Sequence, residues 1–220
     1  MARSIDLFTR RSFLNSIAYG SVLLGASNLL ADELMRTPKQ MEGPFYPDKL
    51  PLDTDNDLII VNDSITKAVG EITHLTGRIL NERGEPLRGS MVEIWQTDNN
   101  GAYLHSGSNN RKQADGNFQG FGRFFTGPSG EYYFRTIKPV PYPGRTPHIH
   151  FMVHRPDQEA FTTQCYIKGN PQNEKDFVFK SSGGPKQREL VSADFLPLEG
   201  SKIGELTAKF DIVLGHTPSA

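Results

Sequence analysis

The sequence has little cysteine: Cys165 is the single one in 220 residues. This excludes an intrachain disulfide and a cysteine-based zinc cluster, so any metal site must use histidine, carboxylate or tyrosine. The sequence also lacks an excess of either charge, with 24 Lys and Arg against 25 Asp and Glu. This balance argues against a nucleic-acid partner, because binding nucleic acid needs a basic face. The apolar stretch at residues 17–30 is shorter than the roughly 20 residues of a membrane-spanning helix, so we expect no membrane association of the mature chain.

The first 31 residues are predicted to be an export signal. Arg10 and Arg11 precede Phe13 and Leu14, and the weakly hydrophobic residues 17–30 follow. This order resembles a twin-arginine signal with processing near Ala31. Such a signal directs a folded, cofactor-loaded protein to the periplasm or outside the cell, which makes the twin-arginine export machinery a partner. A general secretory signal and a buried amphipathic helix are the alternatives.

The rest of the chain favours strands. Its 21 glycines and 15 prolines suit many short strands separated by turns. No helical periodicity is sustained after residue 35. We therefore predict an all-β, antiparallel β-sandwich or barrel with long loops at residues 71–220, after a linker at residues 32–70. The expected strands are 72–80, 91–95, 131–137, 148–154, 161–167 and 209–214.

Two histidines form a candidate metal clamp. His148 and His150 are separated by one residue in a predicted strand, so both side chains project from the same face. Alone this pattern is weak, because strands also carry surface histidines. His154 has the same parity but lies about 13 Å from His150 at about 3.3 Å per residue. We expect it to lie outside the site.

A proline-rich segment at residues 138–147 presents Tyr142 just before the histidines. No Asp or Glu occurs between Glu131 and His154, so a carboxylate near in sequence cannot complete the site. The prolines favour a stiff extended loop. The six residues from Tyr142 to His148 can bridge about 20 Å, so Tyr142 can reach a metal held by the histidines. Tyrosinate is a hard oxygen donor that favours ferric iron over zinc or copper(I). The alternative is a tyrosine packed on the edge of the sandwich.

Several motifs follow one another in an order typical of one enzyme family. They are Glu42–Pro47, Trp95-Gln96, Tyr103 with His105, Gly120–Arg123, Phe134–Pro139, Pro141–Pro143, Arg145 before His148–Phe151, Thr163–Tyr166 and Phe210–Leu214. Together they resemble the intradiol ring-cleavage dioxygenases, and most of all the protocatechuate 3,4-dioxygenase subunits of the iron-bearing type. The resemblance covers nearly all of the chain after residue 31.

The resemblance implies the β-sandwich of the intradiol dioxygenase core and a mononuclear non-haem Fe(III). Its implied ligands are Tyr103, Tyr142, His148 and His150. Arg145 would place a cation beside the substrate ring, Gln164 would line the same cavity, and Tyr142 would also act as a base. The implied reaction inserts both atoms of O₂ into a catechol-type substrate (protocatechuate, catechol or hydroxyquinol-like), giving a cis,cis-muconate type diacid. Both homo-oligomers and hetero-oligomers are compatible with the family.

The sequence departs from the family in the loop before the histidines. Gly144 stands where the protocatechuate enzymes carry tryptophan, and Thr146-Pro147 follows Arg145 in place of the commoner Pro-Ala, so we expect a more open cavity. The chain lacks the helical N-terminal region of catechol 1,2-dioxygenases, so a dimer interface of that kind is not expected. Two other classes stay open: a noncatalytic transthyretin-like β-sandwich binding module, and a zinc or Fe(II) enzyme with a distant carboxylate.

Overall fold

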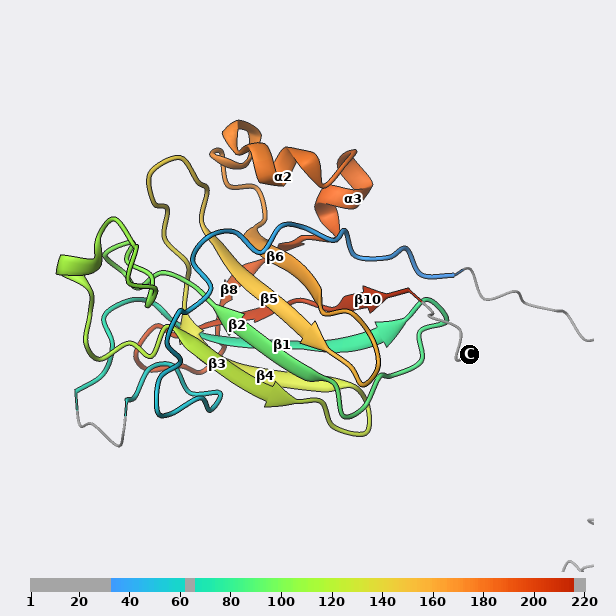
Figure 1. Cartoon of the computed structure of the whole chain (residues 1–220), viewed down its shortest axis with the longest axis horizontal. Coiled ribbons are helices and arrows are strands. Elements are labelled where there is room, and N and C mark those ends of the chain that lie inside the picture. Colours follow the sequence, from blue (N-terminus) through green and yellow to red (C-terminus); the bar gives the residue numbers. More distant parts are fainter. Residues whose placement is uncertain (1–32, 62–65, 216–220) are drawn as a thin grey trace, which may run out of the picture. The chain divides into compact units, whose positions relative to one another are not determined.

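Two five-stranded sheets form the framework of the structure (Figure 1). The computed structural model describes residues 33–61 and 66–215, so the predicted export signal lies outside the described residues. In the first sheet the strand order is β10-β1-β9-β8, and β4 pairs with β1; in the second it is β3-β2-β5-β6-β7. The strands are β1 (Ile72–Asn81), β2 (Met91–Trp95), β3 (Phe121–Phe125), β4 (Glu131–Ile137), β5 (His148–His154), β6 (Phe161–Ile167), β7 (Ser192–Ala193), β8 (Phe195–Pro197), β9 (Leu206–Lys209) and β10 (Ile212–Leu214).

The two sheets enclose one apolar core. Phe134 on β4 meets Phe124 on β3 with ring centroids 6.2 Å apart, and Tyr132 meets Phe151 on β5 at 5.8 Å. On β1 the buried residues alternate with partly exposed ones, as expected for a strand with one face on the core. The predicted β-sandwich is therefore confirmed.

The sheets are mixed rather than purely antiparallel. Strand β1 pairs in parallel with β9 and β10, and β6 pairs in parallel with β7. A parallel pair needs a long crossover connection. Residues 168–191, which contain all the α-helices of the described residues, supply that connection between β6 and β7.

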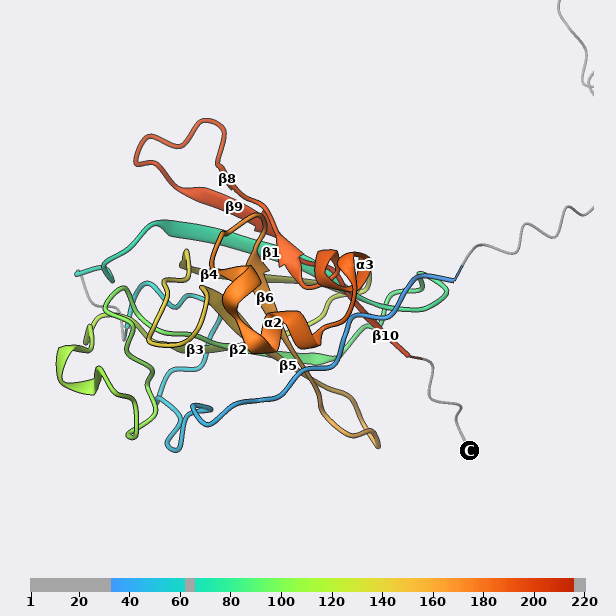
Figure 2. The same ribbon diagram turned by 90° about the horizontal axis from the view of Figure 1, so that it is seen from above.

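The helices within residues 33–61 and 66–215 are short, as the absence of helical periodicity predicts. They comprise α2 (Phe177–Ser181), α3 (Pro185–Glu189) and the 3-10 turns η1 (Arg111–Gln113) and η2 (Asn173–Lys175). Both α2 and α3 lie on one side of the sandwich, over β6 (Figures 1 and 2). Among the described residues, no helix has the length and apolar character needed to cross a membrane.

Residues 34–46, here called the N-terminal arm, run along the sandwich beside the second sheet (Figure 1). The amide of Thr37 donates to the Val213 carbonyl at 3.0 Å, and the amide of Gln40 donates to the Thr162 carbonyl at 2.8 Å. The Gln40 side chain is buried and donates to the Tyr166 hydroxyl at 3.2 Å and the Ser182 hydroxyl at 2.9 Å. The arm thus joins both sheets and α2.

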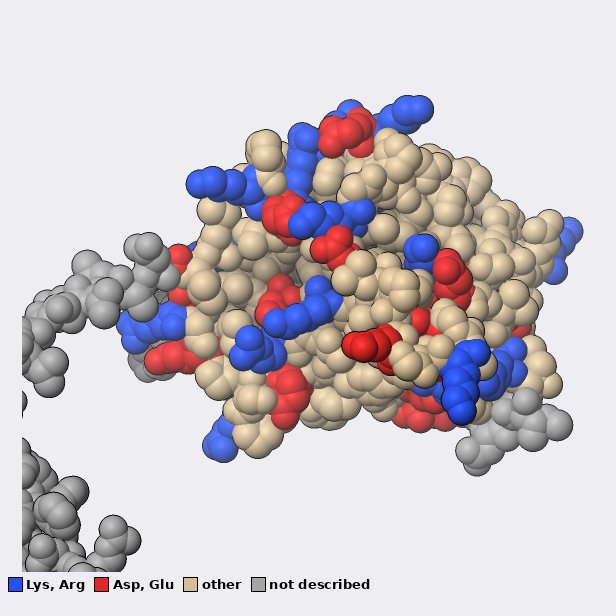
Figure 3. Space-filling view, turned by 180° about the vertical axis from the view of Figure 1, so that it is seen from behind, with Lys and Arg blue, Asp and Glu red and all other residues tan. Residues whose placement is uncertain are grey.

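Basic and acidic side chains are interspersed on the surface (Figure 3). The face in this view carries no broad area of one sign. This distribution agrees with the balanced composition of the sequence.

Gly77 on β1 is a position where a side chain cannot be accommodated. A Cβ there would overlap the Phe210 carbonyl oxygen and lie 2.6 Å from the Tyr132 hydroxyl. We expect Gly77→Ala to lower the free energy of unfolding by roughly 3 kcal/mol, since overpacking a core forces the backbone to move. Denaturant unfolding measures this. Gly116→Ala is the matched control because a Cβ there meets no atom within 4 Å; equal losses in both variants would contradict the prediction.

Candidate active site

Three side chains direct their polar atoms toward one point. The Tyr103 hydroxyl lies 2.9 Å from His150 Nε2 and 3.3 Å from His148 Nε2, and the two Nε2 atoms are 3.1 Å apart. The histidines come from β5, where the one-residue spacing predicted that they share a face. Tyr103 comes from the loop after β2 and is 2% exposed. Residues 45 apart in sequence therefore meet in one buried cluster.

The tautomer of His148 is set by its second ring nitrogen. His148 Nδ1 lies 2.6 Å from the Thr146 carbonyl oxygen, which can only accept, so Nδ1 carries the hydrogen and Nε2 presents a lone pair to the cluster. Burial, with a smaller effect of the Arg145 cation, lowers the pKa of His148 to about 3. The imidazole is thus held neutral and oriented, which is the state that binds a metal ion.

His150 is fixed by stacking. Its ring lies parallel to the indole of Trp95, with centroids 4.7 Å apart and an interplanar angle of 8°. Burial, followed by the neighbouring His148 and Arg145, lowers the pKa of His150 well below its usual value. Its Nδ1 is buried without a hydrogen-bond partner, so protonation at both nitrogens is disfavoured.

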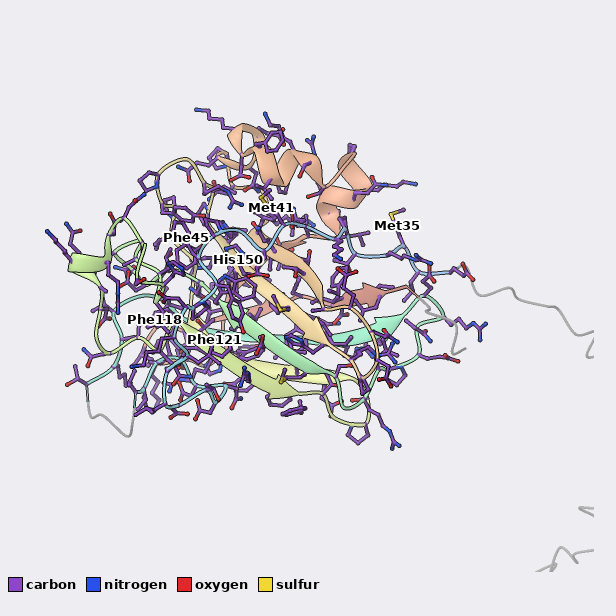
Figure 4. The ribbon with its side chains drawn as sticks, in the orientation of Figure 1. Met35, Met41, Phe45, Phe118, Phe121 and His150 are labelled. Carbon is purple, nitrogen blue, oxygen red and sulfur yellow. The ribbon has the colours of Figure 1, made fainter. Side chains whose placement is uncertain are left out.

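Tyr142 completes the cluster from the proline-rich loop. Its ring centroid lies 5.3 Å from that of Tyr103 and 5.6 Å from that of His148. Phe45 of the N-terminal arm stacks on Tyr103 at 5.0 Å, and Figure 4 shows Phe45 near His150. Burial, and secondarily the Tyr142 hydroxyl, raises the pKa of Tyr103 well above its usual value. Such a buried phenol ionises only where a cation compensates the charge.

This donor set fits a hard metal cation. Two nitrogens bound at right angles to one metal, at about 2.1 Å each, would lie about 3.0 Å apart, close to the 3.1 Å between the histidine Nε2 atoms. No three His, Cys, Asp or Glu side chains gather to hold a metal within residues 33–61 and 66–215. The oxygen donors available beside the histidines are therefore the two tyrosines, which suit ferric iron better than zinc.

Arg145 lies beside this cluster and is held on three sides. Its Nε donates to Asp176 Oδ2 at 2.8 Å, Nη2 to Gln164 Oε1 at 2.6 Å, and Nη1 to the Tyr142 hydroxyl at 3.3 Å. Gln164 is fully buried, and its Nε2 donates to the Met41 carbonyl at 3.1 Å. The structure thus brings together all six residues for which the sequence predicted a site role.

Sequence reasoning gave no role to three residues that position the site: Phe45, Trp95 and Asp176. The family motifs contain Phe45 and Trp95, but their contacts with Tyr103 and His150 follow only from the fold. Asp176 precedes α2 and accepts from the Phe179 amide at 2.8 Å, a capping position that could have been recognised in the sequence. His154 lies outside the cluster, as expected, with Nε2 2.9 Å from Glu93 Oε2.

A cavity of about 470 Å³ borders Tyr103 and is also lined by Leu104, Phe118 and Gln119. Its wall includes none of His148, His150, Tyr142, Arg145 or Gln164. The residues that the family resemblance places beside the substrate therefore do not line this cavity.

The fold and the site define a β-sandwich protein with a cluster of two tyrosines and two histidines suited to a metal. A family model described as dioxygenase matches residues 41–216. The chain belongs to the intradiol ring-cleavage dioxygenase family.

Individual relatives agree with this assignment. The chain is 36% identical over 156 residues to a protocatechuate 3,4-dioxygenase beta chain from Burkholderia cepacia, covering 66% of this chain and 65% of the relative. It is 30% identical over 196 residues to a hydroxyquinol 1,2-dioxygenase from Corynebacterium glutamicum, covering 78% of this chain and 61% of the relative. The chain thus spans a little under two thirds of the length of these curated relatives.

One solved structure matches this chain over its own entire length. The dioxygenase domain of a dioxygenase carbohydrate-binding protein fusion from Streptomyces sp. SirexAA-E superposes with a TM-score of 0.63 at 31% identity, covering 83% of this chain and 100% of that chain. The likeness therefore extends over a complete dioxygenase domain.

Proposed function

We propose that this protein is a non-haem Fe(III)-dependent intradiol dioxygenase that cleaves a catechol-type ring between its two hydroxylated carbons. The observation that carries this proposal is the convergence of the Tyr103 hydroxyl and the Nε2 atoms of His148 and His150 within 3.3 Å of one another. In this proposal Tyr103, Tyr142, His148 and His150 hold the iron. Both oxygens of the diol would chelate ferric iron bound there, and the iron would make a ring carbon reactive toward O₂.

Tyr142 is suited to moving a proton. It is partly exposed, unlike the buried Tyr103, and it lies on a loop. A catechol must lose its hydroxyl protons to bind as a dianion, and the Tyr142 oxygen can accept one of them. The Arg145 Nη1 atom lies 3.3 Å from that oxygen and would stabilise negative charge on it while a metal is bound.

Arg145 supplies positive charge where negative charge develops. Its guanidinium side chain is only 17% exposed, so water screens it weakly. Three hydrogen bonds fix its direction in advance, which makes its electrostatic stabilisation available without reorganisation. Gln164 fixes one arm of this cation, and the fully buried amide excludes water from that side.

Oxygen uptake by the iron-loaded protein tests the proposed function. Catechol, protocatechuate and hydroxyquinol are supplied under air, and a cis,cis-muconate type diacid is expected with one O₂ consumed per ring cleaved. The ferric protein is expected to be red-brown, because tyrosinate bound to Fe(III) gives a charge-transfer band. A colourless protein without oxygen uptake would instead support the binding-module alternative, and a colourless zinc-dependent activity the zinc alternative. The substrate panel also identifies which ring substituents are accepted. We propose that the substrate is a catechol, a hydroxyquinol or a protocatechuate-like compound.

We also propose that residues 1–31 direct the protein through the twin-arginine machinery to the periplasm or beyond. The adjacent Arg10 and Arg11, with the weakly hydrophobic residues after them, support this. Replacing both arginines by lysine is expected to retain the protein in the cytoplasm, as cell fractionation would show; unchanged export would reject the signal.

Assembly of the mature chain, as a homo-oligomer or with a second subunit, is measured by light scattering.

A further inference from the structure

One carboxylate, that of Asp176, connects Arg145 with the strand that carries the histidines. Its Oδ2 accepts from Arg145 Nε at 2.8 Å and from the Thr146 amide at 3.0 Å. The carbonyl of the same Thr146 accepts from His148 Nδ1 at 2.6 Å. Its other oxygen, Oδ1, accepts from the Phe179 amide at 2.8 Å and so caps α2. Asp176 therefore ties the cation, one imidazole and a helix to a single group.

A carboxylate is the group that can make these contacts together. Both of its oxygens accept, whereas an amide presents a donor on one side and a hydroxyl has a single short-reaching oxygen. The Asp176 side chain is fully buried, and burial opposes its ionisation. Backbone hydrogen bonds from Phe179 and Thr146 and the Arg145 cation outweigh that effect and lower its pKa. The residue is therefore charged at neutral pH.

We propose that Asp176 is a positioning residue for the reaction: its carboxylate fixes the Arg145 fork so that Nη1 points at Tyr142 and Nη2 at Gln164. It contacts Arg145 rather than the substrate, so it acts through that cation. This inference rests on the proposed function. It extends the site to the segment containing η2 and α2, which contributes no predicted ligand.

The alternative is that Asp176 only caps α2, and two substitutions separate the roles. Asp176→Ser keeps a capping hydroxyl but does not reach Arg145. Asp176→Asn retains the length of the side chain. Its carbonyl oxygen can still accept hydrogen bonds from Arg145 and Thr146, but its NH₂ group then faces the Phe179 amide, which needs an acceptor. Positioning thus predicts that Ser is the more damaging substitution for catalysis, whereas capping alone predicts similar effects of Ser and Asn, because both are good N-cap residues.

The experiment compares the iron-loaded wild-type protein with both variants. We expect kcat to fall about 100-fold in Asp176→Ser and about 10-fold in Asp176→Asn, because misplacing a catalytic group by about 1 Å costs on the order of 100-fold. A second measurement needs no turnover: titration with catechol under argon, followed by the change in visible absorption, should show weaker binding in the Ser variant. Iron content and melting temperature are recorded, and all assays are run below the lowest melting temperature.

The matched control is Glu174→Gln, in the same segment. Glu174 is 71% exposed and pairs with Arg188 at 3.4 Å, so its loss should leave kcat and catechol binding unchanged. Should Asp176→Ser match the wild type, or Asn be at least as damaging as Ser in both measurements, the positioning role is rejected while the proposed function stands. A wild-type protein that binds catechol under argon but does not cleave it would reject the proposed function and leave the binding comparison to decide on Asp176. A wild-type protein that takes up neither iron nor catechol would overturn both.

Discussion

Replacing Tyr103 by Phe is expected to shift or bleach the visible band of the ferric protein and to lower turnover more than about 100-fold. The reason is that Tyr103 would supply an anionic oxygen directly to the metal, and even the loss of groups that merely orient metal ligands costs about 10–100-fold. The substitution removes one oxygen and keeps the ring that stacks on Phe45 at 5.0 Å, so packing changes little. The measurements are bound iron per chain, the absorption spectrum and oxygen uptake.

Tyr133→Phe is the control for this prediction. Tyr133 lies on β4 in the other sheet, where its hydroxyl is 2.7 Å from His74 Nδ1. The variant loses the same atom from a tyrosine outside the cluster, and its spectrum and turnover should equal those of the wild type. An unchanged spectrum and rate in Tyr103→Phe would reject Tyr103 as a ligand.

Replacing Arg145 by Gln is expected to lower kcat about 100- to 1,000-fold, the usual cost of removing one preorganised group that stabilises the transition state. Arg145→Lys should recover only part of the loss, because an ammonium group keeps the charge but cannot direct three hydrogen bonds in the guanidinium geometry. Steady-state kinetics with the best substrate of the panel measure both variants, and iron content shows whether the metal is retained.

Loss of Arg145 also leaves Asp176 buried without its cation, so the melting temperature must be followed. Arg155→Gln is the control, since Arg155 lies at the turn after β5 and its Nη1 donates to Gln158 at 3.3 Å. It should retain full activity. Equal kcat values for Arg145→Gln and the wild type would show that the cation takes no part in the reaction.

The regular strands could be predicted because local patterning determines them. The expected strands 91–95, 131–137, 148–154 and 161–167 coincide with β2, β4, β5 and β6. The predicted strand 209–214 instead contains the end of β9 and all of β10. The two are separate because Phe210 donates its amide to the Thr76 carbonyl at 2.8 Å, while Asp211 turns to accept from the Arg78 amide at 2.9 Å. Strands β3, β7 and β8 were not predicted, since their pairing partners rather than their own alternation define them.

Some residues of the candidate site could be predicted from the sequence pattern alone, and others could not. The alternation of a strand places His148 and His150 together, so their convergence follows from local geometry. The inclusion of Tyr103 and Gln164 depended on the family resemblance, because their approach is a property of the folded sheets. Asp176 is separated from Arg145 in the chain by strands β5 and β6 and by η2, and no local sequence pattern predicts a contact across that separation.

The N-terminal arm limits how far the chain can be truncated from its N-terminus. The Met41 carbonyl accepts a hydrogen bond from Gln164 Nε2, and Oε1 of the buried Gln40 side chain accepts one from the Gln164 backbone amide at 3.0 Å. A protease that trimmed the chain past these positions would leave the sandwich strands intact but remove two hydrogen-bond partners of Gln164, which holds Arg145. Affinity tags for purification therefore belong ahead of Glu33, with the arm retained in full.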